Sequence, residues 1–431
     1  MFNTGDKVEL KNGGAAVIKR FLGQGGQGAV YEVEYEGMPY ALKWYLPEYL
    51  KKIDQKSFYN NILSNIDSGP PADEFLWPVS ISEYSENSFG YIMNIRPDNY
   101  KSFTSVLNAT SKIKSLKTQL CIAEKICKAF QKLHSLGYSY QDINDGNFFV
   151  DTNDGGVLIC DNDNVAPCGV WMGMAGKDRY MAPEVVMGKK HAGMESDLYS
   201  LAVVLFMLLF IAHPLEGRLI HSCPCITIKL VRRFYAEHPV FVMDPKDQSN
   251  RPVMGIDNNI ISRWPCYPKA IQNLFIRSFT DGLHDASYRV RENEWIDCID
   301  KMIDSIVVCP MCGGEQFYNN PQNSENYFHC EDCGSKIRKP FIFSFGSKKK
   351  CLNLGSEIYS GEIEGVEGGI VGEVIESVKH KGLWGLKNLS DDIWKARFTN
   401  GKEKEYEKGR TVPLFKDTEI IMENKTIRIE M

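Results

Sequence analysis

The stretch YQDINDGN, residues 140–147, decides the fold together with LICDND, residues 158–163. Two short apolar runs, residues 148–150 and 157–160, flank the turn sequence Asn-Asp-Gly-Gly, which is a strong signal for a β-hairpin. The first stretch directly precedes this hairpin and the second closes it. The carboxylate of Asp142 could orient an attacking hydroxyl and accept its proton, whereas Asn147 and Asp161 offer oxygens to magnesium. The ordered set is far less expected by chance than any one of its residues.

A second stretch, LGQGGQGAVY at residues 22–31, contains Gly23, Gly25 and Gly28 in the spacing Gly-x-Gly-x-x-Gly. This spacing alone is not specific, because glycines suit any tight hairpin. Here the glycines lie between two strand patterns with no helix following, which argues against a dinucleotide fold and favours a hairpin that covers phosphates. Lys43 follows on a strand pattern, from which its ammonium could reach the α and β phosphates.

Composition places these stretches in an ordinary globular chain. The 431 residues are 43% hydrophobic and 24% charged, with a formal net charge of -5, so we expect several folded domains and no overall attraction to nucleic acid or to an anionic membrane. The longest apolar run, residues 198–212, is shorter than the roughly 20 residues that cross a bilayer and predicts a buried helix. Residues 1–11 lack the pattern of a secretory signal, so we expect a cytoplasmic protein with reduced cysteines.

Four segments follow from composition and turn signals, and the fold class that they predict is multidomain α+β. Residues 1–97 alternate apolar and polar positions, as in a strand-rich lobe with one helix near residues 54–66. Residues 98–306 show helical periodicity. Residues 307–339 carry paired cysteines, and residues 340–431 are rich in glycine and short alternating runs, which predicts a small all-β domain.

These motifs resemble the eukaryotic-like serine/threonine protein kinases of bacteria over roughly two thirds of the chain. The resemblance implies a bilobal kinase fold, with Lys43, Asp142, Asn147 and Asp161 as catalytic residues and the last two as ligands of Mg²⁺ or Mn²⁺. It implies a nucleotide site for ATP that is formed by Gly23, Gly25, Gly28, Val30, Ala41, Lys43, Met93, Asn94 and Arg96. Further matches are the Ala-Pro-Glu sequence that ends at Glu184, the buried Asp197 of the central helix, and Arg289 as the partner of Glu184.

The order of the glycine stretch, the sequence FLWP at residues 75–78 and the Asp-Gly-Asn sequence is similar to that of a bacterial subgroup associated with tellurite-resistance loci. Kinases of that subgroup are often encoded beside a von Willebrand factor A domain protein and an opposing metal-dependent phosphatase. The resemblance thus implies transfer of the γ-phosphoryl group to Ser/Thr hydroxyls of a protein in signalling or stress response. The alternative is a nucleotide-binding pseudokinase scaffold that recruits partners through its C-terminal half.

Several positions depart from the family pattern. The window expected to hold a helical glutamate, the usual partner of the lysine, contains Asn60 and Asn61 instead. Lys43 could thus lack its usual partner, although an asparagine could still hydrogen-bond its ammonium. Asp163 replaces a glycine, which we expect to affect the substrate side by binding or repelling metal. Asn144 replaces the lysine that contacts the transferred phosphate.

The segment between Asp161 and Glu184 also departs from the pattern. Gln141 replaces the arginine that would receive an activation phosphate, and Tyr180 carries the segment's only hydroxyl. We therefore expect activation without phosphorylation of this segment. Lys177 could supply the missing cation near Asp142.

The cysteines come in two pairs, Cys309 with Cys312 and Cys330 with Cys333, and 17 residues separate the pairs. This spacing predicts a four-cysteine zinc ribbon with a structural Zn²⁺, because four thiolates leave no position for a catalytic water. Two disulfides or loose thiols are the alternative. Nearby basic residues, including the run at residues 348–350, raise the possibility of a nucleic-acid contact, which we consider the lesser one because charge runs usually face solvent.

Residues 340–431 resemble a forkhead-associated domain, a β-sandwich that binds phosphothreonine. The resemblance rests on Leu354 and Gly355, on the sequence SVKH at residues 377–380, on a strand pattern at residues 383–389 and on alternation between residues 412 and 429. Ser356 stands where the family has an arginine, so the fold is expected without the main phosphate ligand.

Overall fold

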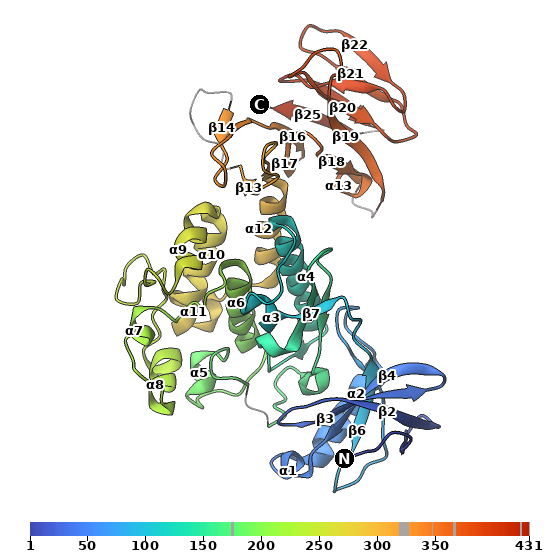
Figure 1. Ribbon diagram of the computed structural model, residues 1–431, viewed down its shortest axis with the longest axis vertical. Coiled ribbons are helices and arrows are strands. Elements are labelled where there is room, and N and C mark those ends of the chain that lie inside the picture. The colour runs from blue at the N-terminus through green and yellow to red at the C-terminus, as the bar shows by residue number, and fades with distance from the viewer. Residues whose placement is uncertain (174–175, 319–326, 347, 365–367, 423–424, 431) are drawn as a thin grey trace. The chain divides into compact units, whose positions relative to one another are not determined.

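The computed structural model describes residues 1–173, 176–318, 327–346, 348–364, 368–422 and 425–430. The chain divides into two compact units, residues 1–298 and 299–431 (Figure 1). Helix α12 (Glu292–Asp304) contains the point of division, so the expected end of the helical lobe at residue 306 falls just after this helix.

The first unit begins with an antiparallel sheet in the order β1-β2-β3-β4-β6-β5. Its strands are β1 (Lys7–Glu9), β2 (Ala15–Gln24), β3 (Gly28–Tyr35), β4 (Met38–Tyr45), β5 (Pro78–Ile81) and β6 (Gly90–Asn94). A short helix α1 (Pro47–Leu50) follows β4.

Helix α2 (Gln55–Ser68) is the single long helix that the sequence predicts in this lobe, and the prediction is confirmed. The side chain of Asp54 caps its first turn by accepting from Ser57 N at 3.1 Å. Gly69 ends it in a backbone conformation with φ of 73° that favours glycine. The helix buries Phe58 and Ile62 against the sheet, at the spacing expected for one apolar face.

The rest of the first unit is largely helical. Its helices are α3 (Phe103–Leu107), α4 (Leu116–Ser135), α5 (Pro183–Val186), α6 (Met194–Phe210), α7 (Arg218–His221), α8 (Ile228–Arg232), α9 (Asn258–Arg263), α10 (Lys269–Phe279), α11 (Asp281–His284) and α12. Helices α4 and α6 pack side by side (Figure 1). Helix α6 is buried from Ser196 to Phe210, which confirms the buried helix predicted from the apolar run, and it ends because Ile211 adopts a left-handed conformation.

The predicted hairpin is formed by β9 (Phe148–Asp151) and β10 (Val157–Ile159), with β7 (Tyr100–Ser102) on the other side of β9. A smaller pair joins β8 (Tyr138–Ser139) to β11 (Ala166–Pro167). The segments at residues 140–147 and 160–165 therefore leave the same small sheet region, which places their polar side chains next to each other.

The second unit contains two short hairpins, then two larger sheets. The hairpins pair β12 (Ile306–Val308) with β13 (Glu315–Phe317) and β14 (Tyr327–His329) with β15 (Lys336–Arg338). One larger sheet has the order β17-β16-β25-β24-β21-β22 and the other has the order β18-β19-β20-β23. These strands are β16 (Phe341–Phe345), β17 (Lys348–Leu352), β18 (Glu357–Tyr359), β19 (Ile370–Glu376), β20 (Trp384–Asn388), β21 (Trp394–Arg397), β22 (Glu403–Tyr406), β23 (Thr411–Pro413), β24 (Glu419–Met422) and β25 (Lys425–Glu430).

Both larger sheets contribute to one apolar core. Phe343 and Ile427 come from the first sheet, and Val374 and Leu386 come from the second. The expected β-rich domain is thus present as two packed sheets, and it also contains a short helix, α13 (Ser360–Glu364).

Candidate active site

Lys43 lies on β4 and is only 4% exposed. An ammonium has three N–H donors, and three side-chain oxygens surround this one: Asp163 Oδ2 at 2.8 Å, Gln27 Oε1 at 2.7 Å and Asp161 Oδ1 at 3.3 Å. Burial lowers the pKa of Lys43, but the charges of Asp161 and Asp163 outweigh burial and hold the pKa above its ordinary value. The amine therefore stays charged.

The structure shows Lys43 bonded to two carboxylates and to Gln27, and not to an asparagine of the helical window. Asn60 is exposed on α2, and Asn61 Nδ2 donates to the backbone oxygen of Val165 at 2.8 Å and of Asp163 at 3.4 Å. Val165 and Asp163 are both 0% exposed, so their carbonyl groups need a donor within the protein. Helix α2 thus holds the loop that follows β10, and Lys43 has carboxylate partners instead.

The side chain of Asp163 is not exposed on the substrate side of the cleft, although its charge adds to the rise in the pKa of Asp142 there. Its side chain is 0% exposed and accepts hydrogen bonds from Lys43 and from the hydroxyl of Tyr45. A buried carboxylate needs such partners because burial without them disfavours its charged form. Asp163 therefore faces the interior of the lobe, where its buried side chain is closed to a metal that Asp161 would hold on the solvent side.

Asp161 has a left-handed backbone, with φ of 55° and ψ of 47°, which aspartate tolerates better than most residues. Its side chain is 37% exposed, unlike that of Asp163. Between them, Asn162 Nδ2 donates to Leu76 O at 2.8 Å and to Ile159 O at 3.0 Å. This amide anchors the loop, in which Asp161 is partly exposed while the next residues, Asn162 and Asp163, are buried.

Asp142 lies in the loop before β9. Asn144 Nδ2 donates to Asp142 Oδ1 at 2.9 Å, and Asn147 Nδ2 donates to the backbone oxygen of Asp142 at 2.9 Å. Burial raises the pKa of Asp142 to about 6, the hydrogen bond from Asn144 lowers it, and the charge of Asp161 adds to the rise. Asn144, which the sequence showed only as a missing lysine, thus orients the candidate base.

The loop of Asp142 is anchored by Asp197, a residue in the first turn of α6 that is only 1% exposed. Its carboxylate accepts from Tyr140 N at 2.6 Å and from Gln141 N at 2.9 Å. His134 bonds Asp197 at 3.2 Å and also Glu292. Burial lowers the pKa of His134, but these hydrogen bonds raise it to about 9, so the ring carries a charge that balances two buried carboxylates. Sequence reasoning did not identify His134 or Glu292.

The glycine stretch joins β2 to β3. A Cβ atom at Gly23 or Gly25 would meet no atom within 4 Å, whereas one at Gly28 would lie 2.5 Å from Trp44 O. Gly28 is therefore required by close strand packing, and the first two glycines leave open space above the cleft. That space is what a backbone must provide to approach a phosphate closely.

The residues assigned to the adenine end share one face of the sheet. Val30 lies directly opposite Lys43, and Ala41 lies opposite Met93, so their side chains project to the same side because strands alternate. Met93 is 7% exposed. Asn94, the last residue of β6, and Arg96, which follows the strand, are exposed. The guanidinium of Arg96 lies 4.3 Å from the ring centre of Phe149 on β9.

Lys177 contacts Asp145 rather than Asp142, at 3.0 Å, and its side chain is 55% exposed. Its charge nevertheless lowers the pKa of Asp142. Gln141 donates to Val170 O at 2.7 Å, so a neutral amide holds the segment at the position of the family's arginine.

The end of this segment is fixed by buried groups. Tyr180 is 2% exposed. Glu184 accepts two hydrogen bonds of 2.8 Å from Arg289, which is the pairing that the resemblance implies. Met174 and Ala175 lie outside the described residues.

Comparison with known proteins agrees with this geometry. The sequence pattern of the family described as "Protein kinase domain" matches residues 16–238, more than half of the chain. The chain belongs to the protein kinase family. It is 26% identical over 175 residues to CBL-interacting serine/threonine-protein kinase 21 of Arabidopsis thaliana, covering 39% of this chain and 40% of that protein. It is 28% identical over 128 residues to calcium-dependent protein kinase 27 of the same plant, covering 27% of this chain and 25% of that protein.

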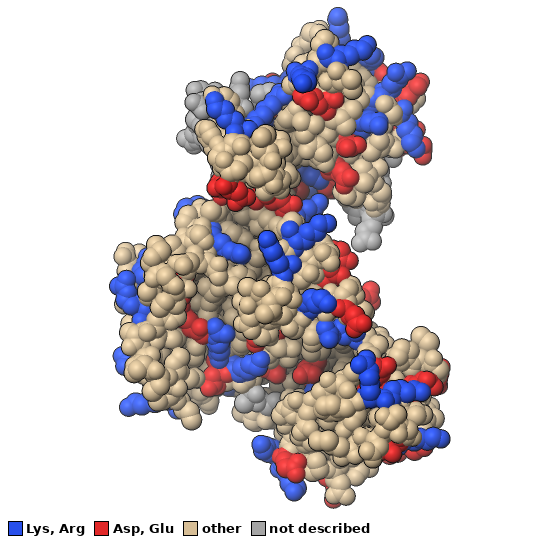
Figure 2. All heavy atoms as spheres, in the orientation of Figure 1, with Lys and Arg blue, Asp and Glu red and all other residues tan. Residues whose placement is uncertain are grey.

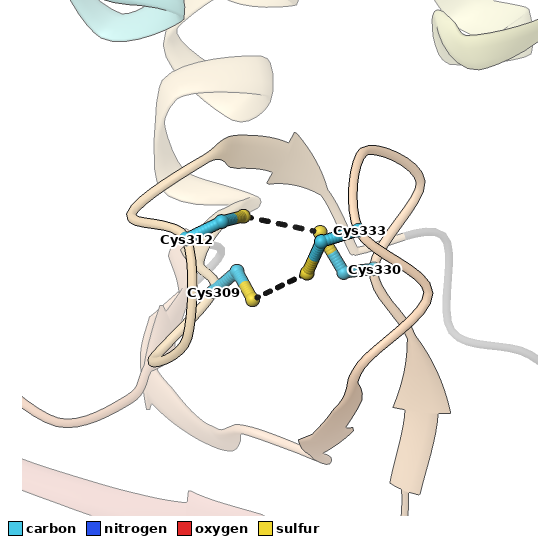
Figure 3. A group of neighbouring side chains, drawn as sticks. All are labelled: Cys309, Cys312, Cys330 and Cys333. Atoms are coloured by element: carbon cyan, nitrogen blue, oxygen red, sulfur yellow. Dashed lines mark hydrogen bonds between the residues drawn. The ribbon is translucent and has the colours of Figure 1, made fainter.

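The kinase also carries the predicted cysteine cluster, at the tips of its two short hairpins (Figure 3). The four sulfurs lie within 4.8 Å of one another, and the distances from Cys309 to Cys333 and from Cys312 to Cys330 are 3.7 Å. Sulfurs bound to one tetrahedral zinc at about 2.3 Å would be about 3.8 Å apart, whereas a disulfide bond is about 2.05 Å. The arrangement is compatible with a zinc ribbon and not with the disulfide alternative.

Basic residues near the cysteines are already engaged within the kinase. Lys349 pairs with Glu430 at 2.7 Å, Lys350 bonds Glu362, and Arg338 stacks 4.6 Å from the ring centre of Trp384. On the face seen in Figure 2, basic and acidic side chains are interspersed over the second unit. This pattern does not favour the nucleic-acid alternative. Among the described helices, none has the length and apolarity to cross a membrane.

Proposed function

We propose that this chain is an ATP- and magnesium-dependent protein kinase that phosphorylates serine or threonine hydroxyls. The observation that carries the proposal is the placement of Lys43, which is charged, buried and bonded to two aspartates. The glycine loop leaves open space above this site, and Asp142 belongs to the same cleft. The relative that matches over 175 residues is named a serine/threonine-protein kinase, which supports that acceptor.

The cleft fits ATP and a divalent cation in its donor chemistry. Asn147 uses its amide N–H on the backbone of Asp142, which leaves its Oδ1 as an acceptor, and Asp161 presents a partly exposed carboxylate. Amide and carboxylate oxygens are the ligands that Mg²⁺ prefers. A bound magnesium would neutralise charge on the phosphates.

Asp142 then acts on the acceptor. Its carboxylate orients the hydroxyl and takes its proton while the hydroxyl oxygen bonds to the γ-phosphorus and the bond to the ADP oxygen breaks. The pKa of about 6 leaves this carboxylate ionised at neutral pH, so it can serve as the base. Lys43 steadies the phosphates as a point charge.

The rival function is a pseudokinase scaffold, and one assay separates the two. Purified protein is incubated with labelled ATP, magnesium and a generic protein acceptor, beside Asp142→Asn and Asp161→Asn. We expect transfer by the parent and a fall of about 10²- to 10⁴-fold in Asp142→Asn. Asp154→Asn, the same change in the nearby hairpin turn, is the matched control and should retain transfer. Absence of transfer by the parent with retained ATP binding would favour the scaffold.

The second unit is proposed to serve docking, with Zn²⁺ held by Cys309, Cys312, Cys330 and Cys333 as a structural staple. A forkhead-associated-like sandwich is supported by its two packed sheets and by the loop in which His380 N bonds Ser377 Oγ at 3.2 Å. Ser356 bonds Asn353 at 2.8 Å and offers no cation to a phosphate, so we do not extend the proposal to phosphopeptides.

A bacterial role beside a von Willebrand factor A domain protein and a phosphatase, and a cytoplasmic location, rest on the sequence resemblance alone. Identification of co-encoded proteins tests the first. Fractionation of cells that express the chain tests the second.

A further inference from the structure

The lysine of this kinase has a carboxylate partner in an unusual place. Lys43 and Asp163 are 120 residues apart in sequence, yet their charged atoms are 2.8 Å apart and their side chains are 5% and 0% exposed. In the kinase template the lysine is held by a glutamate on the helix beside it. Here α2 contains no glutamate.

Helix α2 contacts the loop that contains Asp163 and not the lysine itself. Asn61 and Asn65 each donate to Val165 O at 2.8 Å, so the helix supplies neutral donors to the backbone of the loop that contains Asp163. Compared with the kinase template, the carboxylate that bonds the lysine lies on the loop instead of the helix, and the helix carries amides instead. Lys43 is thus still linked to α2, but through the loop that contains Asp163.

We propose that Asp163 is the positioning residue that holds Lys43 for the phosphates, in place of a helical glutamate. The inference rests on the proposed kinase function. Of the three acceptors on Lys43, Gln27 comes from the glycine loop and Asp161 is the most distant and is partly exposed, so these two can release the ammonium to a phosphate oxygen. Asp163 cannot turn to solvent, because it is fully buried, and it keeps the lysine in place.

One loop carries both the partner of the lysine and the candidate metal ligand. The lysine partner Asp163 and the metal ligand Asp161 lie two residues apart on one loop, which Asn162 ties to Leu76 and Ile159. Outward movement of α2 would break the bonds of its asparagines but would not remove the carboxylate from Lys43. Placement of the lysine therefore follows the metal-binding loop and not the helix.

The test compares Asp163→Asn, which keeps size and removes charge, with the double variant Asn61→Glu/Asp163→Gly, which returns the carboxylate to the helix. For each, kcat and the KM values for ATP and for the protein acceptor are measured, with nucleotide affinity from a fluorescent ATP analogue and folding from thermal melting. Asp151→Asn is the matched control, because Asp151 is 5% exposed and its carboxylate accepts from Asn99, Asn153 and Asp154, none of which is a candidate site residue.

We expect Asp163→Asn to lower kcat/KM for ATP by about 10- to 100-fold, as loss of a charge-assisted bond implies, with an unchanged KM for the acceptor. The double variant should recover most of this loss, and Asp151→Asn should match the parent. Unchanged ATP kinetics in Asp163→Asn, or no recovery in a double variant that melts like the parent, would overturn the proposal. If the parent transfers no phosphate, the proposed function fails, and Asp163 is then judged by nucleotide affinity, which must weaken in Asp163→Asn.

Discussion

Protonation of Asp142 should set the acid limit of this kinase, and Asn144 should set where that limit lies. The pKa of Asp142 is raised from 3.8 to about 6, chiefly by burial, with Asn144 and Lys177 acting against the rise and Asp161 and Asp163 adding to it. Because the base works only when ionised, activity is lost as the pH falls through the pKa. At pH 5, about a tenth of Asp142 is ionised, so kcat/KM should be about a tenth of its plateau.

Asn144→Ala removes the 2.9 Å hydrogen bond to Asp142 Oδ1. A bond to a charged acceptor is worth about 1.5–3 kcal/mol, and one pKa unit corresponds to about 1.4 kcal/mol. Since Asp142 is partly open to solvent, we take the lower end and expect the acid limit to rise by about one unit, to near pH 7. Above pH 8 the variant should approach the parent.

The assay is kcat/KM for ATP, measured from pH 5 to 9 for the parent, for Asn144→Ala and for Asn153→Ala. Asn153 lies in the hairpin turn, and its variant should keep the parent's profile. A limit set by ionisation of the nucleotide would be the same in all three proteins. The reasoning is refuted if the limit does not move in Asn144→Ala, or if it moves to lower pH.

Two further outcomes are expected. Purified protein should contain about one zinc per chain. Cys309→Ser should lose this zinc and expose residues 306–338 to protease, because a ribbon this short has too little core without metal. Cys168→Ser is the control, and retention of zinc by Cys309→Ser would contradict the site. Tyr180→Phe should transfer phosphate at the parent's rate, since the 2% exposed side chain is closed to a modifying enzyme; an activating phosphate on Tyr180, found by mass spectrometry, would contradict this.

Much of the fold was predictable because it depends on local patterns. The alternation of β3 and β4, the cap and stop of α2 at Asp54 and Gly69, and the apolar length of α6 each lie within a short window of sequence. The spacing of the cysteine pairs likewise predicted a cluster whose four sulfurs do converge. The β-rich character of residues 340–431 followed from alternation and turns, although the strand order did not.

The sequence by itself determined which chemical groups the cleft contains, since Lys43, Asp142, Asn147 and Asp161 stand in the order of a known motif set. Only the tertiary structure decided how they are held. The missing glutamate and the extra aspartate appeared in sequence as two separate departures, and no window along α2 could show that Asp163 compensates for the absent partner. The pairing joins atoms more than a hundred residues apart. Its strength comes from burial between β4 and a folded loop, which is a property of packing and not of local sequence.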